Sequence, residues 1–165
     1  MKIVFGNPKN VALDISIERT IEQWVYGRFQ LWLGGIAIGS QADQGVDLKG
    51  CINWLSDFVV SPRNRCAPEL MLAPKDIIWR ETVDSVFEST DENAQYPDSF
   101  SRFHISHLGM SAFDTVILVL INDGEERERY IWQYNEKTIQ DYTAPLGSLE
   151  ACAKEAVSWF RELNK

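Results

Sequence analysis

Two short turns that contain glycine constrain the fold of this chain more than any other feature of its sequence. Gly34-Gly35 and Asp123-Gly124 each separate two runs rich in apolar residues. Glycine supplies the positive φ angles that tight hairpins require, so each pair of runs is predicted to form antiparallel strands. The four strands predicted in this way are 27–33, 36–38, 113–121 and 127–134. Strands joined by hairpins cannot build a parallel sheet.

Three further segments place apolar residues along one face of a helix. Asp47 is the predicted N-cap of the first helix, Pro74 opens the second, and Ser148 precedes the third. The three apolar stripes are Leu48, Cys51, Ile52, Leu55 and Val59; Trp79, Val83, Val86 and Phe87; and Leu149, Cys152, Ala153, Ala156, Phe160 and Leu163. Because these helices do not alternate with every strand, the predicted class is α+β, with an antiparallel sheet packed by two or three α-helices.

Three segments have weaker patterns. Residues 11–17 alternate apolar and polar positions, which predicts a half-buried strand, whereas residues 19–25 are ambiguous and would fit one helical turn. The alternation from Phe103 to His107 predicts a strand, on which His104 and His107 point to opposite faces. We therefore expect one half-buried and one surface histidine, and no shared metal ion.

The length and charge of the chain limit the classes of protein to which it can belong. Its 165 residues predict a single domain over residues 1–165. The longest apolar run, Val116 to Ile121, is far shorter than a membrane-spanning helix, and the first apolar stretch ends at Gly6, too early for a secretory signal. We therefore expect a cytoplasmic protein. A net charge of -8 argues against nucleic acid as a ligand, because phosphates are neutralised by clustered lysine and arginine.

The motifs of common enzymes are missing from the sequence. There is no nucleophile elbow, no HExxH, no phosphate-binding glycine loop and no dinucleotide fingerprint. Cys51, Cys66 and Cys152 are spaced too irregularly for a zinc site or a paired disulfide framework, and reduced thiols are expected. The sequence thus predicts no catalytic residue, no metal and no cofactor.

An uninterrupted acidic segment stands out in the middle of the chain. Between Glu81 and Ser101 there is no lysine or arginine. A solvated surface would explain such a segment, but acidic charge also speeds encounter with a cationic protein, and aromatic residues can then anchor the complex. The candidate partner-binding residues are Glu81, Asp84, Glu88, Asp91, Glu92, Tyr96, Asp98 and Phe100. A second acidic candidate is the hairpin tip at Asp123, Glu125, Glu126 and Glu128, although Arg127 and Arg129 dilute its charge.

Several short motifs resemble those of the bacterial immunity protein 42 family. They are Ile3-Val4-Phe5-Gly6-Asn7-Pro8, Trp24 before Gly27-Arg28-Phe29, Asp47-Leu48, His104-Ile105-Ser106, Phe113-Asp114, Ile131-Trp132 and Trp159-Phe160. Members of such families are small cytosolic proteins made beside a secreted polymorphic toxin, as in contact-dependent growth inhibition. The resemblance implies a non-catalytic antitoxin that binds its own toxin, and it supplies no catalytic residues.

The leading hypothesis is therefore an immunity protein that forms a one-to-one complex with a basic toxin domain, for example a nuclease, and binds neither nucleic acid nor a membrane. Two alternatives remain open. One is an acidic secretion chaperone that binds an unfolded segment of an exported effector, and the other is a small enzyme with a polar cleft. Neither the toxin nor the mode of inhibition follows from the sequence.

Overall fold

A computed structural model of the chain describes residues 1–84, 101–135 and 137–163. Its Cα positions divide into two compact units, each assembled from separate segments of the chain. Unit 1 comprises Met1–Pro62, Ser106–Val116 and Gly147–Lys165, and unit 2 comprises Arg63–Ile105 and Ile117–Leu146. The expectation that residues 1–165 behave as one domain stays a prediction.

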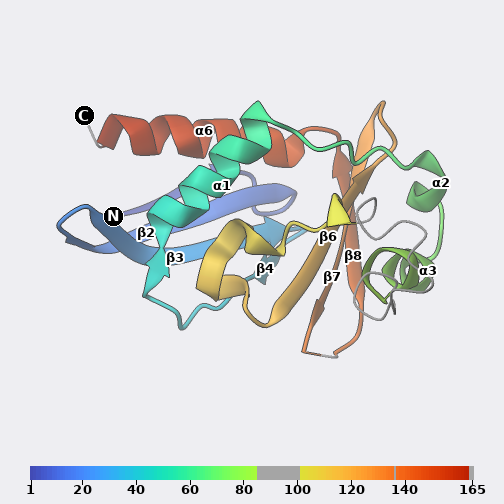
Figure 1. Cartoon of the computed structure of the whole chain (residues 1–165), viewed down its shortest axis with the longest axis horizontal. Helices are drawn as coiled ribbons and strands as arrows, with labels where there is room; N and C mark the ends of the chain where they lie inside the picture. The colour runs from blue at the N-terminus through green and yellow to red at the C-terminus, as the bar shows by residue number, and fades with distance from the viewer. Residues whose placement is uncertain (85–100, 136, 164–165) are drawn as a thin grey trace. The chain divides into compact units, whose positions relative to one another are not determined.

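Unit 1 contains a five-stranded antiparallel sheet in the order β1-β2-β3-β4, with β5 also paired to β3 (Figure 1). The strands are β1 (Lys2–Gly6), β2 (Val11–Ile21), β3 (Trp24–Leu33), β4 (Ile36–Ile38) and β5 (Val46–Asp47). The turn between β3 and β4 has φ angles of 58° at Gly34 and 89° at Gly35, so the hairpin predicted from these glycines is confirmed.

The helical turn considered for residues 19–25 is not formed. β2 and β3 continue as a hairpin to the pair Ile21 and Trp24, and Glu22 in the turn has a φ of 53°. A bulge between Ile17 and Arg19 shifts the register within this hairpin. Cross-strand pairing therefore outweighs the ambiguous local pattern, as is usual for short segments.

Two helices, α1 (Leu48–Val60) and α6 (Ser148–Leu163), lie side by side over one face of this sheet (Figure 1). The Asp47 carboxylate caps α1 by accepting the Lys49 amide at 3.1 Å, which confirms the predicted N-cap. Leu13, Ile15, Phe29 and Leu31 of the sheet are fully buried on this side. The buried apolar face fixes the register of β2 and β3, because a one-residue slip would expose it.

The predicted strand from Phe103 to His107 is wrong. His104 makes a single antiparallel bridge to Val119, and the chain then enters a 3-10 segment, η2 (Ser106–Phe113), that is kinked at Met110. Phe113 belongs to this segment, where its ring packs edge-on against Phe29 at 6.3 Å. For this reason the strand predicted from Phe113 begins only at Val116.

Unit 2 contains an antiparallel sheet of three strands in the order β6-β7-β8. The strands are β6 (Val116–Asn122), β7 (Arg127–Tyr134) and β8 (Gln140–Pro145). Two short helices, α2 (Pro68–Met71) and α3 (Lys75–Trp79), precede a π-helical turn at Arg80–Asp84. Trp79 and Val83 are buried as predicted, whereas Val86 and Phe87 lie outside the described residues. The buried cluster of this unit is Ala67, Met71, Ile78, Trp79, Val83, Phe103, Val119, Ile121 and Ile131.

The predicted fold class is confirmed. Antiparallel strands and separate helices make this an α+β protein, with the strands divided between two sheets. One face of the unit 1 sheet carries α1 and α6, and the side chains of the opposite face form the strongest candidate site among the described residues.

Candidate functional site

The candidate site lies on the face of the unit 1 sheet that points away from α1 and α6, here called the outer face. Successive side chains of a strand point to opposite faces, and along β3 buried residues alternate with partly exposed ones. Val25, Phe29 and Leu31 are buried on the helix side. The other set, called the β3 stripe, consists of Trp24, Tyr26, Arg28, Gln30 and Trp32.

The middle of the outer face is hollowed. The hollow has a volume of about 280 Å³ and is lined by Lys2, Asp14, Ser16, Arg28, Gln30, Trp32 and Gln41. Two ion pairs border it, because Lys2 Nζ lies 3.0 Å from Asp14 Oδ2 and Arg28 Nε lies 3.5 Å from Glu18 Oε1. Ser16 Oγ also donates to Glu18 Oε1 at 2.8 Å. The charges around the hollow are therefore balanced.

Three nitrogens of the β3 stripe are buried without a hydrogen-bond partner in the part of the chain that the structure describes. They are Arg28 Nε, Gln30 Nε2 and Trp32 Nε1. A buried donor that makes no hydrogen bond costs about 1–3 kcal/mol. Arg28 Nε does lie 3.5 Å from Glu18 Oε1, so the donors of the hollow's lining that have no nearby acceptor are those of Gln30 and Trp32.

Apolar side chains are exposed at the hairpin end of the same face. Ile21 of β2 lies opposite Trp24 of β3, and the two residues are 51% and 43% exposed. Beside them, the guanidinium carbon of Arg19 lies 5.1 Å from the centre of the Tyr26 ring. Tryptophan, tyrosine and arginine dominate the energetically important positions of protein interfaces. The chemistry of this end is therefore that of a protein contact.

The β3 stripe was not predicted from the sequence, although its signal was present. The alternation from residue 27 onward predicted the strand through its apolar residues alone. The other set consists of large aromatic and polar side chains and begins at Trp24, inside the segment that was considered as a helical turn. Only the pairing of Ile21 with Trp24 places these side chains in one row.

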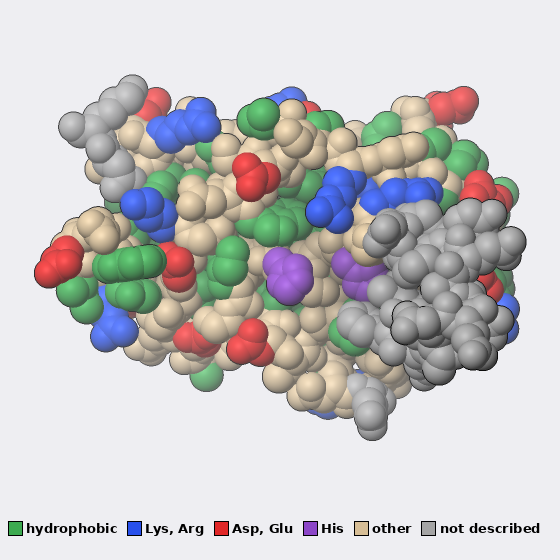
Figure 2. All heavy atoms as spheres, viewed as in Figure 1, with side chains coloured by type: hydrophobic (Ala, Val, Ile, Leu, Met, Phe, Trp, Pro, Cys, Tyr) green, Lys and Arg blue, Asp and Glu red, His purple; other side chains and the backbone are tan. Residues whose placement is uncertain are grey.

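The predicted acidic site falls mainly outside the described residues. Glu88, Asp91, Glu92, Tyr96, Asp98 and Phe100 lie outside them. Glu81 and Asp84 are partly buried in the π-helical turn, where Glu81 Oε1 is 3.5 Å from Arg80 Nε. Figure 2 shows acidic and basic side chains interspersed over the visible part of the described surface.

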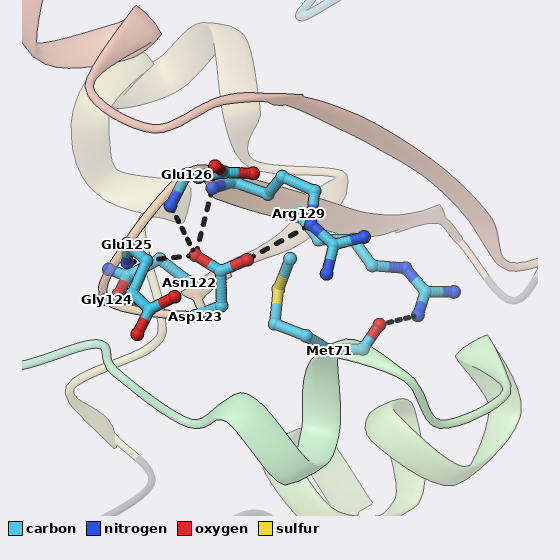
Figure 3. A network of polar contacts seen from close by, with 8 residues as sticks. Met71, Asn122, Asp123, Gly124, Glu125, Glu126 and Arg129 are labelled. Carbon is cyan, nitrogen blue, oxygen red and sulfur yellow. Dashed lines mark hydrogen bonds and ion pairs between the residues drawn. The ribbon is translucent and has the colours of Figure 1, made fainter.

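At the second acidic candidate, the β6–β7 hairpin tip, two of the four carboxylates bind the protein's own groups, and Figure 3 shows this for Asp123. One oxygen of Asp123 accepts the backbone amides of Glu125, Glu126 and Arg127 at 3.1, 2.9 and 2.9 Å. Glu128 is only 4% exposed and accepts the Tyr130 hydroxyl. The exposed acids of this tip are therefore Glu125 and Glu126.

Histidine and cysteine have structural environments. His104 Nε2 lies 2.6 Å from the Thr82 carbonyl oxygen and is half-buried, while His107 is exposed, as expected. The three cysteines are free thiols, and burial raises the pKa of Cys51 far above its usual range. Within the described ranges no three His, Cys, Asp or Glu side chains are grouped so that they could hold a metal ion. None of the described helices has the length and apolar character needed to cross a membrane.

Comparisons with known proteins agree with this fold. The family profile of immunity protein 42 matches residues 1–159. A crystal structure of CdiI from Burkholderia dolosa AUO158 is similar, with a TM-score of 0.79 and 16% sequence identity, over 95% of this chain and 99% of that one. No curated protein matches the sequence.

Proposed function

The chain belongs to the immunity protein 42 family, and from this premise we propose that it neutralises a cognate bacterial toxin by binding to it. The observation that carries the proposal is the match of the family profile to residues 1–159. The complex would contain one copy of each protein and form in the cytoplasm of the cell that makes them. Neutralisation would protect that cell, or its siblings, during contact-dependent growth inhibition.

The proposed inhibition is non-catalytic and requires no cofactor. An inhibitor needs a surface complementary to its partner, whereas an enzyme needs reacting groups held in a pocket. The outer face of unit 1 has the chemistry of a binding surface, because it combines partly exposed aromatic side chains with hydrogen-bond donors and balanced ion pairs.

The proposed partner is a basic protein, such as a nuclease domain. A nuclease must be cationic to bind nucleic acid, and a net charge of -8 on this chain would attract such a protein. The acidic segment that contains Glu81, Asp84, Glu88, Asp91, Glu92 and Asp98 would steer the encounter, with Tyr96 and Phe100 as anchors.

The decisive experiment is co-expression with the protein encoded directly upstream. We expect expression of that protein alone to stop growth, co-expression to restore it, and the two proteins to co-purify in equal amounts. An unrelated acidic protein of similar size is the control for non-specific charge effects. Failure both to rescue growth and to co-purify would contradict the proposal, and a bound partner that is unfolded would favour a secretion chaperone.

A further inference from the structure

We propose that the β3 stripe is the surface that holds the toxin, with Trp24 as its apolar anchor and the hollow at Arg28, Gln30 and Trp32 as the site for a loop of the toxin that presents carbonyl oxygens. This inference rests on the proposed function and adds the location and chemistry of the contact. The β3 stripe would hold the bound toxin, whereas the acidic segment would raise the rate at which the two proteins meet.

The anchor follows from the exposure of the hairpin end. β1 and the preceding Met1 bond to β2 only as far as Ile17, and β5 pairs with β3 only at Tyr26 and Gly27. The pair Ile21 and Trp24 therefore lies beyond both neighbouring strands. The exposure of a tryptophan beside an isoleucine to water costs free energy. A partner that covers both side chains removes this cost and thereby gains binding free energy.

The class of group that enters the hollow follows from its unmatched donors. Gln30 Nε2 and Trp32 Nε1 need acceptors, and the described residues provide none, whereas Arg28 Nε already lies 3.5 Å from Glu18 Oε1. Gln30 is only partly buried and has a flexible side chain, so rotation can bring its amide donor to the opening of the hollow.

The charges around the hollow select a neutral acceptor. Lys2 is paired with Asp14, and Arg28 with Glu18, so a carboxylate from the partner would add an unbalanced negative charge next to two acids. A backbone or amide carbonyl oxygen accepts the same hydrogen bonds without this cost. The occupant is therefore a polar, uncharged loop of the toxin.

Two substitutions test the inference against the catalytically inactivated protein encoded upstream. Trp24→Ala removes the anchor and should weaken the complex by about 30-fold or more, which corresponds to the loss of an interface hot spot. Gln30→Met keeps the shape of the side chain but removes the donor, and should weaken binding by about 10-fold. Leu72→Ala is the control, because Leu72 is an exposed apolar residue of unit 2, and it should leave the dissociation constant within 2-fold.

The stability of Gln30→Met separates a binding role from a structural one. Removal of an unmatched donor should leave the melting temperature unchanged or raise it, while binding weakens. Amide exchange of the complex should also show protection at residues 18–25. If the wild-type protein binds the toxin and both variants bind it with unchanged affinity, the inference is overturned. Amide protection confined to segments other than 18–25 would overturn it as well. Either result would leave the proposed immunity function intact. Absence of wild-type binding would instead overturn the immunity function, and this inference with it.

Discussion

Asp123 binds Arg127 through both of its carboxylate oxygens: one accepts the backbone amide at 2.9 Å and the other accepts the guanidinium Nε at 3.1 Å. The amides of Glu126 and Glu125 also point at this carboxylate. Hydrogen bonds from the Arg127 amide first, and then from those of Glu126 and Glu125, hold the pKa of the Asp123 carboxyl well below its usual range. The carboxylate thus organises the turn between β6 and β7.

We predict that Asp123→Asn destabilises the protein most at neutral pH. A carboxyl whose pKa is lower in the folded state contributes stability above its unfolded pKa, about 4, and loses this contribution as the pH falls towards the folded value. The difference between wild type and variant in urea unfolding should therefore shrink as the pH falls from 7 to 3. Glu125→Gln, in the same turn, is the control, and an equal response in both variants would contradict the prediction.

Arg129 should be the most sensitive surface cation of unit 2. Its guanidinium binds Asp141 at 2.7 Å and the carbonyl oxygens of Met71 and Ala73 at 3.0 and 2.8 Å. Figure 3 shows the contact with Met71. Lysine cannot reproduce this fork of donors, so Arg129→Lys should lower the free energy of unfolding by about 2 kcal/mol. Arg80→Lys, at an exposed pair, should cost less than about 0.5 kcal/mol. Chemical denaturation measures both, and equal costs would contradict the role of the two carbonyl contacts.

The three thiols should differ in reactivity. Burial raises the pKa of Cys51, with a further contribution from Asp47, so its thiolate is scarcely populated at neutral pH. Cys152 is also buried, whereas Cys66 is partly exposed. Iodoacetamide at pH 8, followed by mass spectrometry, should modify Cys66 at least about ten times faster than Cys51. The control is the unfolded protein in urea, in which all three cysteines should react at the same rate. Equal modification rates of Cys66 and Cys51 in the native protein would contradict this prediction.

Charge reversal in the acidic segment should affect association more than dissociation. Changing Asp91, Glu92 and Asp98 to lysine should slow association with the toxin by about ten-fold at low salt and flatten its dependence on ionic strength. The control variant changes Glu125, Glu126 and Glu155, which are exposed, to lysine. Its net charge is the same as that of the first variant. Stopped-flow measurements compare the two variants. Equal slowing would indicate an effect of net charge alone and contradict steering by this segment.

Local chemistry explains which elements could be predicted. Asp47 caps α1, and Gly34 and Gly35 form the tight turn between β3 and β4, both as predicted. These features depend on contacts within a few residues. The segment around Trp24 was left ambiguous and the strand predicted around His104 was wrong, because both conformations depend on pairing with residues distant in the sequence.

The candidate site shows the same division. The segment Glu81 to Ser101 could be proposed because like charges adjacent in sequence are visible in the sequence itself, and it stays a prediction. The hollow on the outer face could not be predicted, because Lys2 of β1, Asp14 of β2 and Gln30 of β3 come together only when the strands pair.

The sequence by itself determined the α+β class, the β3–β4 hairpin, the cap of α1, the net charge, and motifs sufficient to suggest the immunity protein 42 family. Each of these follows from short-range geometry or composition. Only the tertiary structure decided that Trp24, Tyr26, Arg28, Gln30 and Trp32 share one exposed face, and that Asp123 and Glu128 turn their charges inward. Strand register and burial arise from contacts between distant segments, and these contacts decide which side chains a partner can reach.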